Sequence, residues 1–326
     1  MRFLLDDEQE AFARSLDTML SASDVPSAAR AWASGDHAPG LAVWSRLAEA
    51  GVFALAVPET YEGVGPLPVE LVVAFLELGR HAVPGPVVET VAAAALLTRL
   101  SELGDASPAK RLLPGVAGGD EIATLAVEGC GPYALDPDAA TVTLVVSADV
   151  LCVAPGHGPL HPSVDPVRRL AVPAREGEAL AVGPQVAAAA AYAADVAALT
   201  TAAQALGVGL ALLDRTVAYV KQRTQFGSPV GSFQAVKHRL ADTLIGLEFA
   251  RPLLYGAALT MASADVAAAK AAAGEAAYAA SRTALQLHGA VGYTDELDLS
   301  LWLRKARPLR DAWGTPAGCR ARVLAG

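Results

Sequence analysis

The sequence has little charge and few aromatic residues. Among its 326 residues only 18% are charged and 6% are aromatic, whereas 53% are hydrophobic. Chains that remain unfolded have the opposite balance, so this chain is expected to bury a sizeable core. A surface with so little charge also indicates apolar areas covered by other subunits, and we therefore expect an oligomer.

Basic residues are outnumbered as well. The chain has 25 Lys and Arg against 34 Asp and Glu, a formal net charge of −9. This excludes a general nucleic-acid or anionic-membrane surface, because both require a positive field. No stretch reaches the roughly 18 consecutive apolar residues of a bilayer span. The first residues turn acidic at Asp6, unlike a secretory signal, so we expect a cytoplasmic protein without a membrane span.

Cysteine and metal-ligand spacing are also lacking. The three cysteines form no CxxC pair and have no histidine close in sequence, which argues against a disulfide framework or a zinc site. The histidines we considered, His81, His157 and His161, show no metal-ligand spacing either. The sequence therefore predicts no metal centre.

What the chain does have is a change of composition and hydrophobic spacing along its length, which predicts three domains. Residues 1–114 show mostly helical spacing, with Gly79 expected to end one helix. Residues 115–183 combine Pro and Gly with β-branched runs and predict a small β domain. Its strands are expected at 141–146, 150–153, 170–172 and 180–182. So small a β domain needs support from the helices around it.

Residues 184–326 predict a bundle of helices. Leucine and valine recur at spacings of three and four from Leu206 to Val220, and again from Phe233 to Leu247, with Ser232 as the expected cap of the second helix. A third helix, 264–288, has alanine on nearly every face and Gly289 as its end. Such a small-sided helix packs centrally in its bundle or against another subunit. The fold class is mainly α with a small β domain.

Two strings in the last domain point to a known family. They are Arg223-Thr-Gln-Phe-Gly-Ser-Pro-Val-Gly-Ser-Phe-Gln and Gln286-Leu-His-Gly-Ala-Val-Gly-Tyr. With the helix–β–helix order, they closely resemble the acyl-CoA dehydrogenase family. The resemblance covers essentially the whole chain and implies an all-α N-terminal domain, a middle β domain and a C-terminal four-helix bundle. It also implies FAD, extended at a subunit interface.

The resemblance assigns FAD contacts to residues of both strings. Arg223 would chelate the pyrophosphate with two parallel hydrogen bonds, although spacing alone favours an arginine that neutralises its own helix end. The other matched positions are the adenine-flanking Gln225, Phe226 and Gln234, and the segment that reaches a neighbouring subunit's dinucleotide, Gln286, Gly289 and Ala290.

The middle domain departs from the family pattern. Of the family's first flavin-covering segment only Glu128 is kept, and a strand or two is expected to be missing. Counting on from the turn at Gly131, Thr143 takes the position of a flavin-contacting threonine. It is the one flavin contact that we expect from this domain.

The catalytic base is a second departure. The family's glutamate removes the proton α to the thioester, and such a base contributes roughly a hundred- to ten-thousandfold in rate. Trp313 stands at its usual position, and Ala197 at the position some members use instead. Asp311 and Asp195 lie two residues from these positions, about half a helical turn, which usually turns a carboxylate away.

These observations favour a base-lacking subunit of a heteromeric acyl-CoA dehydrogenase. It resembles the shorter chain of two-component actinobacterial enzymes acting on CoA thioesters of steroid side chains, with a longer homologue as partner and a separate electron acceptor. One alternative is a self-sufficient homo-oligomeric flavin dehydrogenase or oxidase that uses a displaced carboxylate, such as Asp311, as its base. Another is a non-catalytic scaffold, since one fold hosts many functions.

Overall fold

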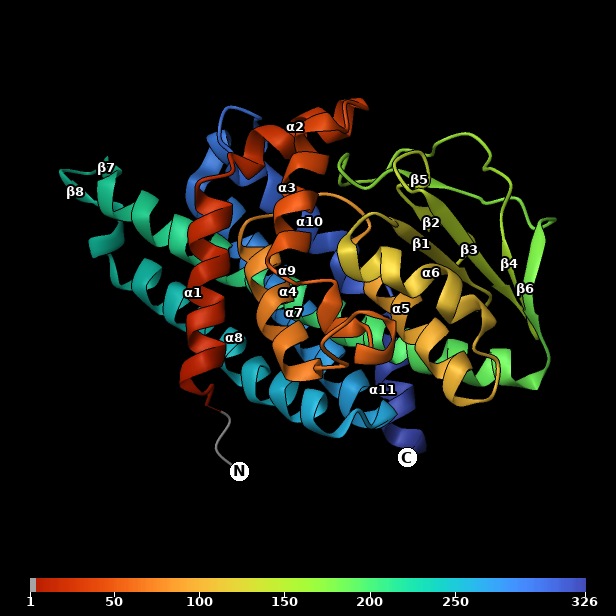
Figure 1. Ribbon diagram of the computed structural model, residues 1–326. Helices are drawn as coiled ribbons and strands as arrows, with labels where there is room; N and C mark the ends of the chain where they lie inside the picture. Colours follow the sequence, from red (N-terminus) through yellow and green to blue (C-terminus); the bar gives the residue numbers. More distant parts are fainter. Residues whose placement is uncertain (1–3) are drawn as a thin grey trace. The chain divides into compact units, whose positions relative to one another are not determined.

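The computed structural model describes residues 4–326 and is mainly helical with small sheets, as predicted (Figure 1). The chain forms two compact units. We call one the bundle unit, which holds the residues up to Asp17, Val72–Ala82 and Thr201–Gly326. The other is the sheet unit, Thr18–Leu71 and Val83–Thr200. Three of the four boundaries between the units fall within helices, and the fourth follows α4 at Ala82. The domain limits at 114 and 183 stay a prediction.

Helices and a four-stranded sheet make up the sheet unit. Its helices, complete or in part, are α1 (Asp7–Ser21), α2 (Val25–Ser34), α3 (Ala38–Glu49), α4 (Pro68–Arg80), α5 (Val87–Glu102), α6 (Ser107–Gly118) and α7 (Pro184–Gln222). Its strands are β1 (Ala123–Val127), β2 (Ala134–Leu135), β3 (Val142–Ser147), β4 (Val150–Val153), β5 (Leu170–Ala171) and β6 (Glu178–Val182).

The strands form two sheets. The larger has the order β1-β3-β4-β6, with β1 and β3 parallel and the other pairs antiparallel, and β2 pairs with β5. Four of these strands lie where the sequence predicted them. Strand β1 is buried along its whole length, and the Thr90 hydroxyl of α5 donates to the Ala123 carbonyl at 2.7 Å. The small sheet therefore leans on helix α5, as its size required.

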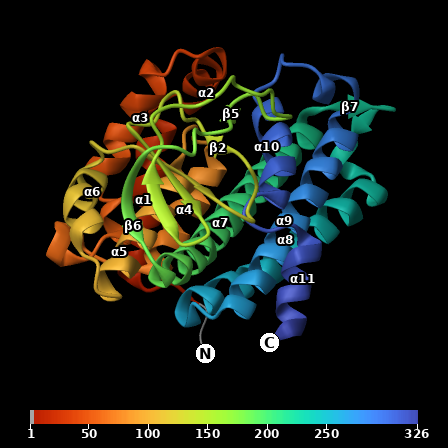
Figure 2. The ribbon, with the colours of Figure 1, turned by 90° about the vertical axis from the view of Figure 1, so that its right-hand side faces the viewer.

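The bundle unit is built around α9 (Ser263–His288). That helix packs against α8 (Gln234–Thr260), α10 (Leu299–Asp311) and α11 (Pro316–Ala325) (Figure 2). Most of its buried positions are alanine, which lets neighbouring helices approach closely. The prediction that the small-sided helix packs centrally is confirmed.

Two sequence expectations about helix ends are wrong. Gly79 lies inside α4, where an added Cβ would stand 2.1 Å from the Gln204 carbonyl oxygen of α7. The glycine permits a backbone-to-backbone helix crossing and ends nothing. Ser232 does not cap α8, because its hydroxyl donates to the Pro229 carbonyl and Phe233 occupies the N-cap position.

Helix α7 is long and apolar enough, by length and composition, to cross a membrane. Every residue in its most apolar window is buried inside the protein. A core helix passes the same test, so one such helix is weak evidence for a span. The sequence predicted a helix here. Its possible length as a membrane span was not recognised, because charged residues interrupt its apolar runs.

Candidate functional site

A short hairpin follows α7, and four of the predicted cofactor residues lie in or next to it. Strands β7 (Thr224–Gln225) and β8 (Ser228–Pro229) pair antiparallel, and the Val230 amide donates to the Arg223 carbonyl at 2.7 Å. Helix α8 begins five residues after the hairpin, at Gln234. The structure thus brings together Arg223, Gln225, Phe226 and Gln234, and all four are exposed.

Phe226 occupies a position that its residue type disfavours. It and Gly227 form the two-residue turn of the hairpin, with φ of 53° and 76°. Positive φ at both turn residues is the type I′ geometry, which favours Asn or Gly over an aromatic residue. The ring is 93% exposed and contacts only Phe233 edge-on, with centroids 6.3 Å apart. Packing within this unit does not explain the residue, whereas stacking on a planar ligand would.

Arg223 is the first residue beyond α7, and its amide still donates to the Tyr219 carbonyl. In the described part of the chain its guanidinium makes no ion pair, so both of its edges are open to a bidentate anion. Nearby, α8 begins without a side-chain cap hydrogen bond, and the N-terminal end of a helix favours an anion. The donor set fits a diphosphate with an aromatic base beside it.

The C-terminal end of α9 lies at the same end of the bundle unit. The Tyr219 ring of α7 stacks on His288 of α9, with centroids 4.1 Å apart. Burial lowers the pKa of His288, whose Nδ1–H donates to the Ala284 carbonyl. Sequence reasoning missed this pair, although Tyr219 stands one helical turn before Arg223.

The pair places the second predicted group of cofactor residues, the exposed Gln286, Gly289 and Ala290, near the end of α7. Gly289 has φ of 65° and ends α9, and an added Cβ there would meet nothing within 4 Å. Its backbone is therefore open to the approach of a ligand or another chain.

The turn after α10 carries Trp313, which the resemblance places at the family's usual base position. Trp313 is half-buried with φ of 54°, a strained conformation for a bulky residue. The fully buried Lys270 of α9 fixes this turn, because its ammonium donates to the carbonyls of Leu309, Arg310 and Gly314 at 3.0, 2.9 and 3.1 Å. A lone lysine within an alanine-rich helix was the sequence signal for it.

Asp311, the candidate displaced base, is held by arginines. Its carboxylate pairs with Arg307 at 3.5 Å and with Arg310 at 3.3 Å, and its side chain is 37% exposed. Both ion pairs occupy this carboxylate with neighbouring residues of its own helix. Lys270 lies 16 residues before Gln286 on the same helix, roughly 24 Å along its axis, so the structure does not bring Asp311 to the Arg223 group.

The second base position is also without a carboxylate. Ala197 is fully buried in α7, within the sheet unit, and Asp195 two residues earlier is half-buried. Successive helical positions are 100° apart, so the Asp195 side chain does not take the direction of the Ala197 methyl.

Thr143 lies on β3, in the sheet unit, beside Thr124 of β1. Its side chain is half-buried, whereas Thr124 is fully buried. Glu128, the residue kept from the family segment, accepts a hydrogen bond from the Ala148 amide at 2.8 Å and so ties the end of β1 to the β3–β4 turn. Its carboxylate already has a structural role.

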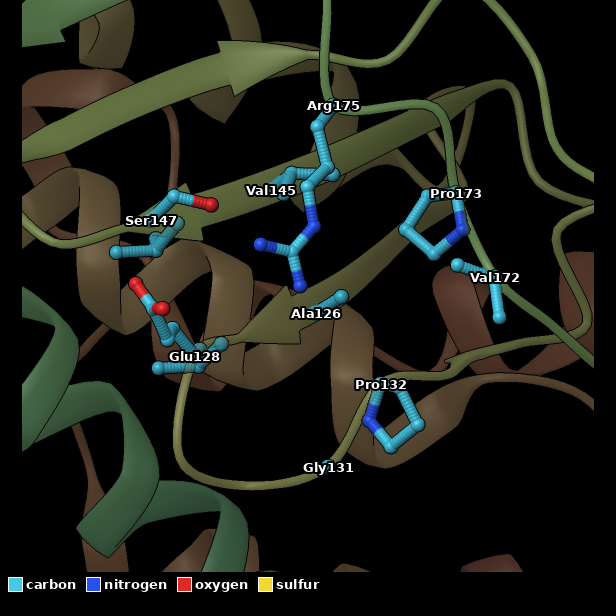
Figure 3. A pocket seen from close by; sticks show the side chains of 11 residues that line it. Ala126, Glu128, Gly131, Pro132, Val145, Ser147, Val172, Pro173 and Arg175 are labelled. Carbon is cyan, nitrogen blue, oxygen red and sulfur yellow. The ribbon is translucent and has the colours of Figure 1, made fainter.

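Two cavities lie next to Glu128. The smaller, about 20 Å³, lies below the Arg175 side chain, which reaches over the strands with Ser147 and Glu128 to one side and Pro173 to the other (Figure 3). The larger, about 410 Å³, lies between the ends of β1 and β3 and the first turns of α7, whose lining residues are alanines. Its volume and apolar walls are typical of a small-molecule site.

The comparisons with known proteins decide the family. Residues 6–120 match the family model of the acyl-CoA dehydrogenase N-terminal domain, and residues 187–324 match that of the C-terminal domain. The acyl-CoA dehydrogenase IpdE2 of Mycobacterium tuberculosis is 32% identical over 314 residues, which cover 92% of this chain and 91% of that one.

This chain belongs to the acyl-CoA dehydrogenase family.

Solved structures agree with this assignment. A variant of the Tcur3481–Tcur3483 steroid acyl-CoA dehydrogenase matches with a TM-score of 0.83 at 25% identity, over 98% of this chain and 97% of that one. The ChsE4–ChsE5 complex from Mycobacterium tuberculosis matches in fold, with a TM-score of 0.83 at 23% identity, over 100% and 98% of the two chains. This acyl-CoA dehydrogenase chain thus shares its fold with both structures over nearly the whole of its sequence.

Proposed function

We propose that this chain is the base-lacking subunit of an FAD-dependent acyl-CoA dehydrogenase, which acts on a CoA thioester together with a longer homologous partner. The observation that carries the proposal is the pair of positions at which the family places its glutamate. One holds Trp313 in a strained turn, and the other holds the buried Ala197. The partner would supply the glutamate.

The hairpin group supports a role in binding FAD. Its exposed guanidinium, two amides and solvent-facing aromatic ring suit a diphosphate and an adenine. Bound FAD would supply the hydride acceptor for the β carbon of the thioester. This chain's own part is to hold the pyrophosphate with Arg223 and to flank the adenine with Gln225, Phe226 and Gln234. Gln286, Gly289 and Ala290 would approach the cofactor of a neighbouring subunit, and Thr143 would contact flavin from the sheet unit.

The relatives support the heteromeric form. Two matched structures carry names of paired chains, Tcur3481–Tcur3483 and ChsE4–ChsE5. A CoA thioester with a steroid-derived acyl group is the substrate class that we propose, with a separate electron acceptor and a cytoplasmic location.

Flavin content and turnover test the proposal. The chain purified alone should show little visible flavin absorption and almost no acyl-CoA oxidation. Coexpression with a longer homologue ending its bundle in Tyr-Glu-Gly should yield a yellow complex with turnover. Strong flavin and turnover by the homomer would refute the proposal. A complex that forms without flavin would instead support a scaffold.

A second measurement addresses Asp311 as the base. Because two arginines hold this carboxylate, Asp311→Asn should leave the turnover of the coexpressed complex within about twofold. A loss of a hundredfold or more, the usual cost of removing a general base, would support the self-sufficient alternative in place of the subunit role.

A further inference from the structure

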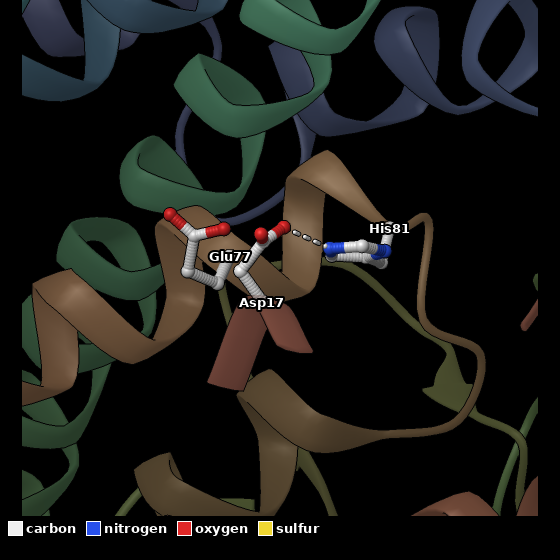
Figure 4. A group of neighbouring side chains, drawn as sticks. All are labelled: Asp17, Glu77 and His81. Carbon is white, nitrogen blue, oxygen red and sulfur yellow. Dashed lines mark hydrogen bonds and ion pairs between the residues drawn. The ribbon is translucent and has the colours of Figure 1, made fainter. Parts of the chain in front are cut away.

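A cluster of three possible metal ligands lies in the bundle unit, apart from the residues discussed so far. Glu77 and His81 come from the end of α4, and Asp17 comes from α1. One ligand atom from each lies within 4.8 Å of the other two. Figure 4 shows the Asp17 carboxylate between the Glu77 carboxylate and the His81 ring.

The positions of the three residues suit a cation that enters from solvent. Glu77 and His81 are four residues apart, so they face the same side of the α4 end. The Asp17 side chain is 54% exposed and the His81 side chain 17%, whereas Glu77 as a residue is only 9% exposed. The buried carboxylate thus forms the floor of the site and Asp17 its open rim. The C-terminal end of α4 adds a partial negative charge that favours a cation.

The Glu77 side chain gives a second, independent observation that points to a bound ligand. Its Oε2 atom is buried and accepts no hydrogen bond. The Arg80 guanidinium lies 3.6 Å from this Oε2 atom as a long ion pair and also pairs with Asp214 at 3.2 Å. A buried carboxylate with an unused lone pair is costly unless a ligand completes it.

We infer that Asp17, Glu77 and His81 form a binding site for a divalent transition metal ion of the zinc type. Two carboxylates and one imidazole are a set of ligands that Zn²⁺ accepts, with water in the fourth position. The His81 Nε2 and Asp17 Oδ1 atoms are 2.8 Å apart and share a hydrogen bond, which the metal would replace. Tetrahedral coordination needs ligand atoms about 3.4 Å apart, so side-chain rotation suffices.

Sequence spacing missed this site because Asp17 comes from a helix 60 residues before Glu77. The bound ion would connect α1 to α4 and neutralise the buried carboxylate. It therefore has a structural role and stands independently of the proposed cofactor and substrate.

Metal titration of the full-length chain, stripped with a chelator, tests the inference. Zn²⁺ should bind with a stoichiometry of one per chain and raise the melting temperature, and Co²⁺ should give the visible absorption of a tetrahedral site. His81→Gln and Asp17→Asn should each weaken Zn²⁺ binding at least tenfold. Asp17→Asn is the safer variant for folding because its side chain is the more exposed, and circular dichroism checks both variants.

Three comparisons make the result specific. His238→Gln, at an exposed histidine of α8, and Asp214→Asn, at the partner of Arg80, should keep binding within about twofold. Arg80→Gln should tighten it, because a competing cation is removed. Absence of stoichiometric Zn²⁺ binding by the wild-type chain, or equal binding by the folded Asp17→Asn variant, would overturn the inference. A response to Mg²⁺ alone would overturn the transition-metal assignment.

Discussion

At the scale of single residues, Phe226 is unfavourable for the folding of this chain but well placed to bind a ligand. The aromatic ring is almost fully exposed, and its backbone has the positive φ of a type I′ turn. Both features disfavour phenylalanine when only the folding of this chain is considered. A residue that is unfavourable for the isolated chain and well placed for stacking indicates selection for a ligand or partner contact.

Phe226→Asn should therefore change stability and flavin affinity in opposite directions. Asparagine tolerates positive φ, so the melting temperature should stay the same or rise slightly. Loss of the stacking ring should weaken flavin binding by the coexpressed complex about tenfold, since a base–aromatic stack contributes roughly 1–3 kcal/mol. Thermal melting and flavin titration provide the two readouts.

The control for this prediction is Leu324→Asn, at an exposed position of α11. Phe233→Asn is unsuitable because Phe233 occupies the N-cap position of α8. Unchanged flavin affinity would contradict the stacking role.

Asp136 is a second residue with a distinct signature, in the sheet unit. It is fully buried with φ of 48°, and its Oδ1 accepts the Arg169 amide at 3.0 Å. Burial raises its pKa to about 7, against the effect of the Arg169 hydrogen bond. Below this pKa the folded protein therefore holds a neutral carboxyl group, which has nearly the shape of an asparagine amide.

This makes stability depend on pH near neutrality. The folded pKa of Asp136 exceeds the unfolded value of about 3.9, so its stabilising contribution is full below pH 4 and is lost as pH rises through 7. Asp136→Asn removes this loss. Between pH 5 and pH 8 the variant should therefore gain about 3 kcal/mol in the free energy of unfolding relative to the wild type. Denaturant unfolding at both pH values measures the difference. Equal pH profiles would show that Asp136 titrates normally.

At the scale of elements, helix crossings depend on glycine. Gly207 lies within α7, and an added Cβ would stand 1.9 Å from the Leu76 carbonyl oxygen of α4. Leu76 and Gly79 thus meet α7 with almost no space between the two backbones. The apolar stripes of both helices predicted that they are helices, but not that they cross here.

Gly207→Ala should destabilise the protein by about 3 kcal/mol or more, because backbone atoms must move to admit the methyl group. Gly246→Ala is the matched control in α8, where the nearest atom to an added Cβ is 4.0 Å away. That change should stabilise the helix by up to about 1 kcal/mol. Thermal unfolding compares them. Similar melting temperatures for the two variants would mean that the α4–α7 contact is looser than the structure indicates.

The elements also show how far sequence reasoning reaches. Helix α9 was predicted within one residue at its start, because an alanine-rich run with a terminal glycine is governed by local propensity. Strand β1 and the β7–β8 hairpin were missed. The first has no alternation because all of it is buried, and the second has only two-residue strands with a proline and an atypical turn. Elements fixed by tertiary contacts lack a local signal.

In the candidate site, too, the sequence indicated some residues and gave no signal for others. The strings in 223–234 and 286–290 identified residues that the structure gathers at one end of the bundle unit, through the unpredicted Tyr219–His288 stack. Lys270 was missed because burial of a lysine depends on carbonyls 39 to 44 residues away. Motifs report residues that meet a shared ligand, whereas supporting contacts are specific to each chain's packing.

At the scale of the whole molecule, the low charge content corresponds to one exposed apolar face. Helix α8 presents Ile245, Phe249 and Leu253 at intervals of four residues, and these are 51%, 72% and 46% exposed. Residues at this spacing form one stripe along a helix. An apolar stripe of this kind on a folded chain indicates an interface, which agrees with the proposal that the chain works with a partner.

Charge placed in the middle of this stripe should prevent assembly. Phe249→Asp buries an unpaired carboxylate in any interface that the stripe forms, which costs several kcal/mol and lowers the association constant at least a hundredfold. Light scattering after size-exclusion chromatography should then show the variant as a smaller species than the wild-type assembly, with unchanged circular dichroism.

Leu324→Asp, at a position 88% exposed near the C-terminus, is the control and should assemble normally. Because Gln234, one of the proposed FAD contacts, begins the same helix, lost assembly should be accompanied by lost flavin. A Phe249→Asp protein that assembles fully and keeps its flavin would show that α8 is not the surface that meets the partner.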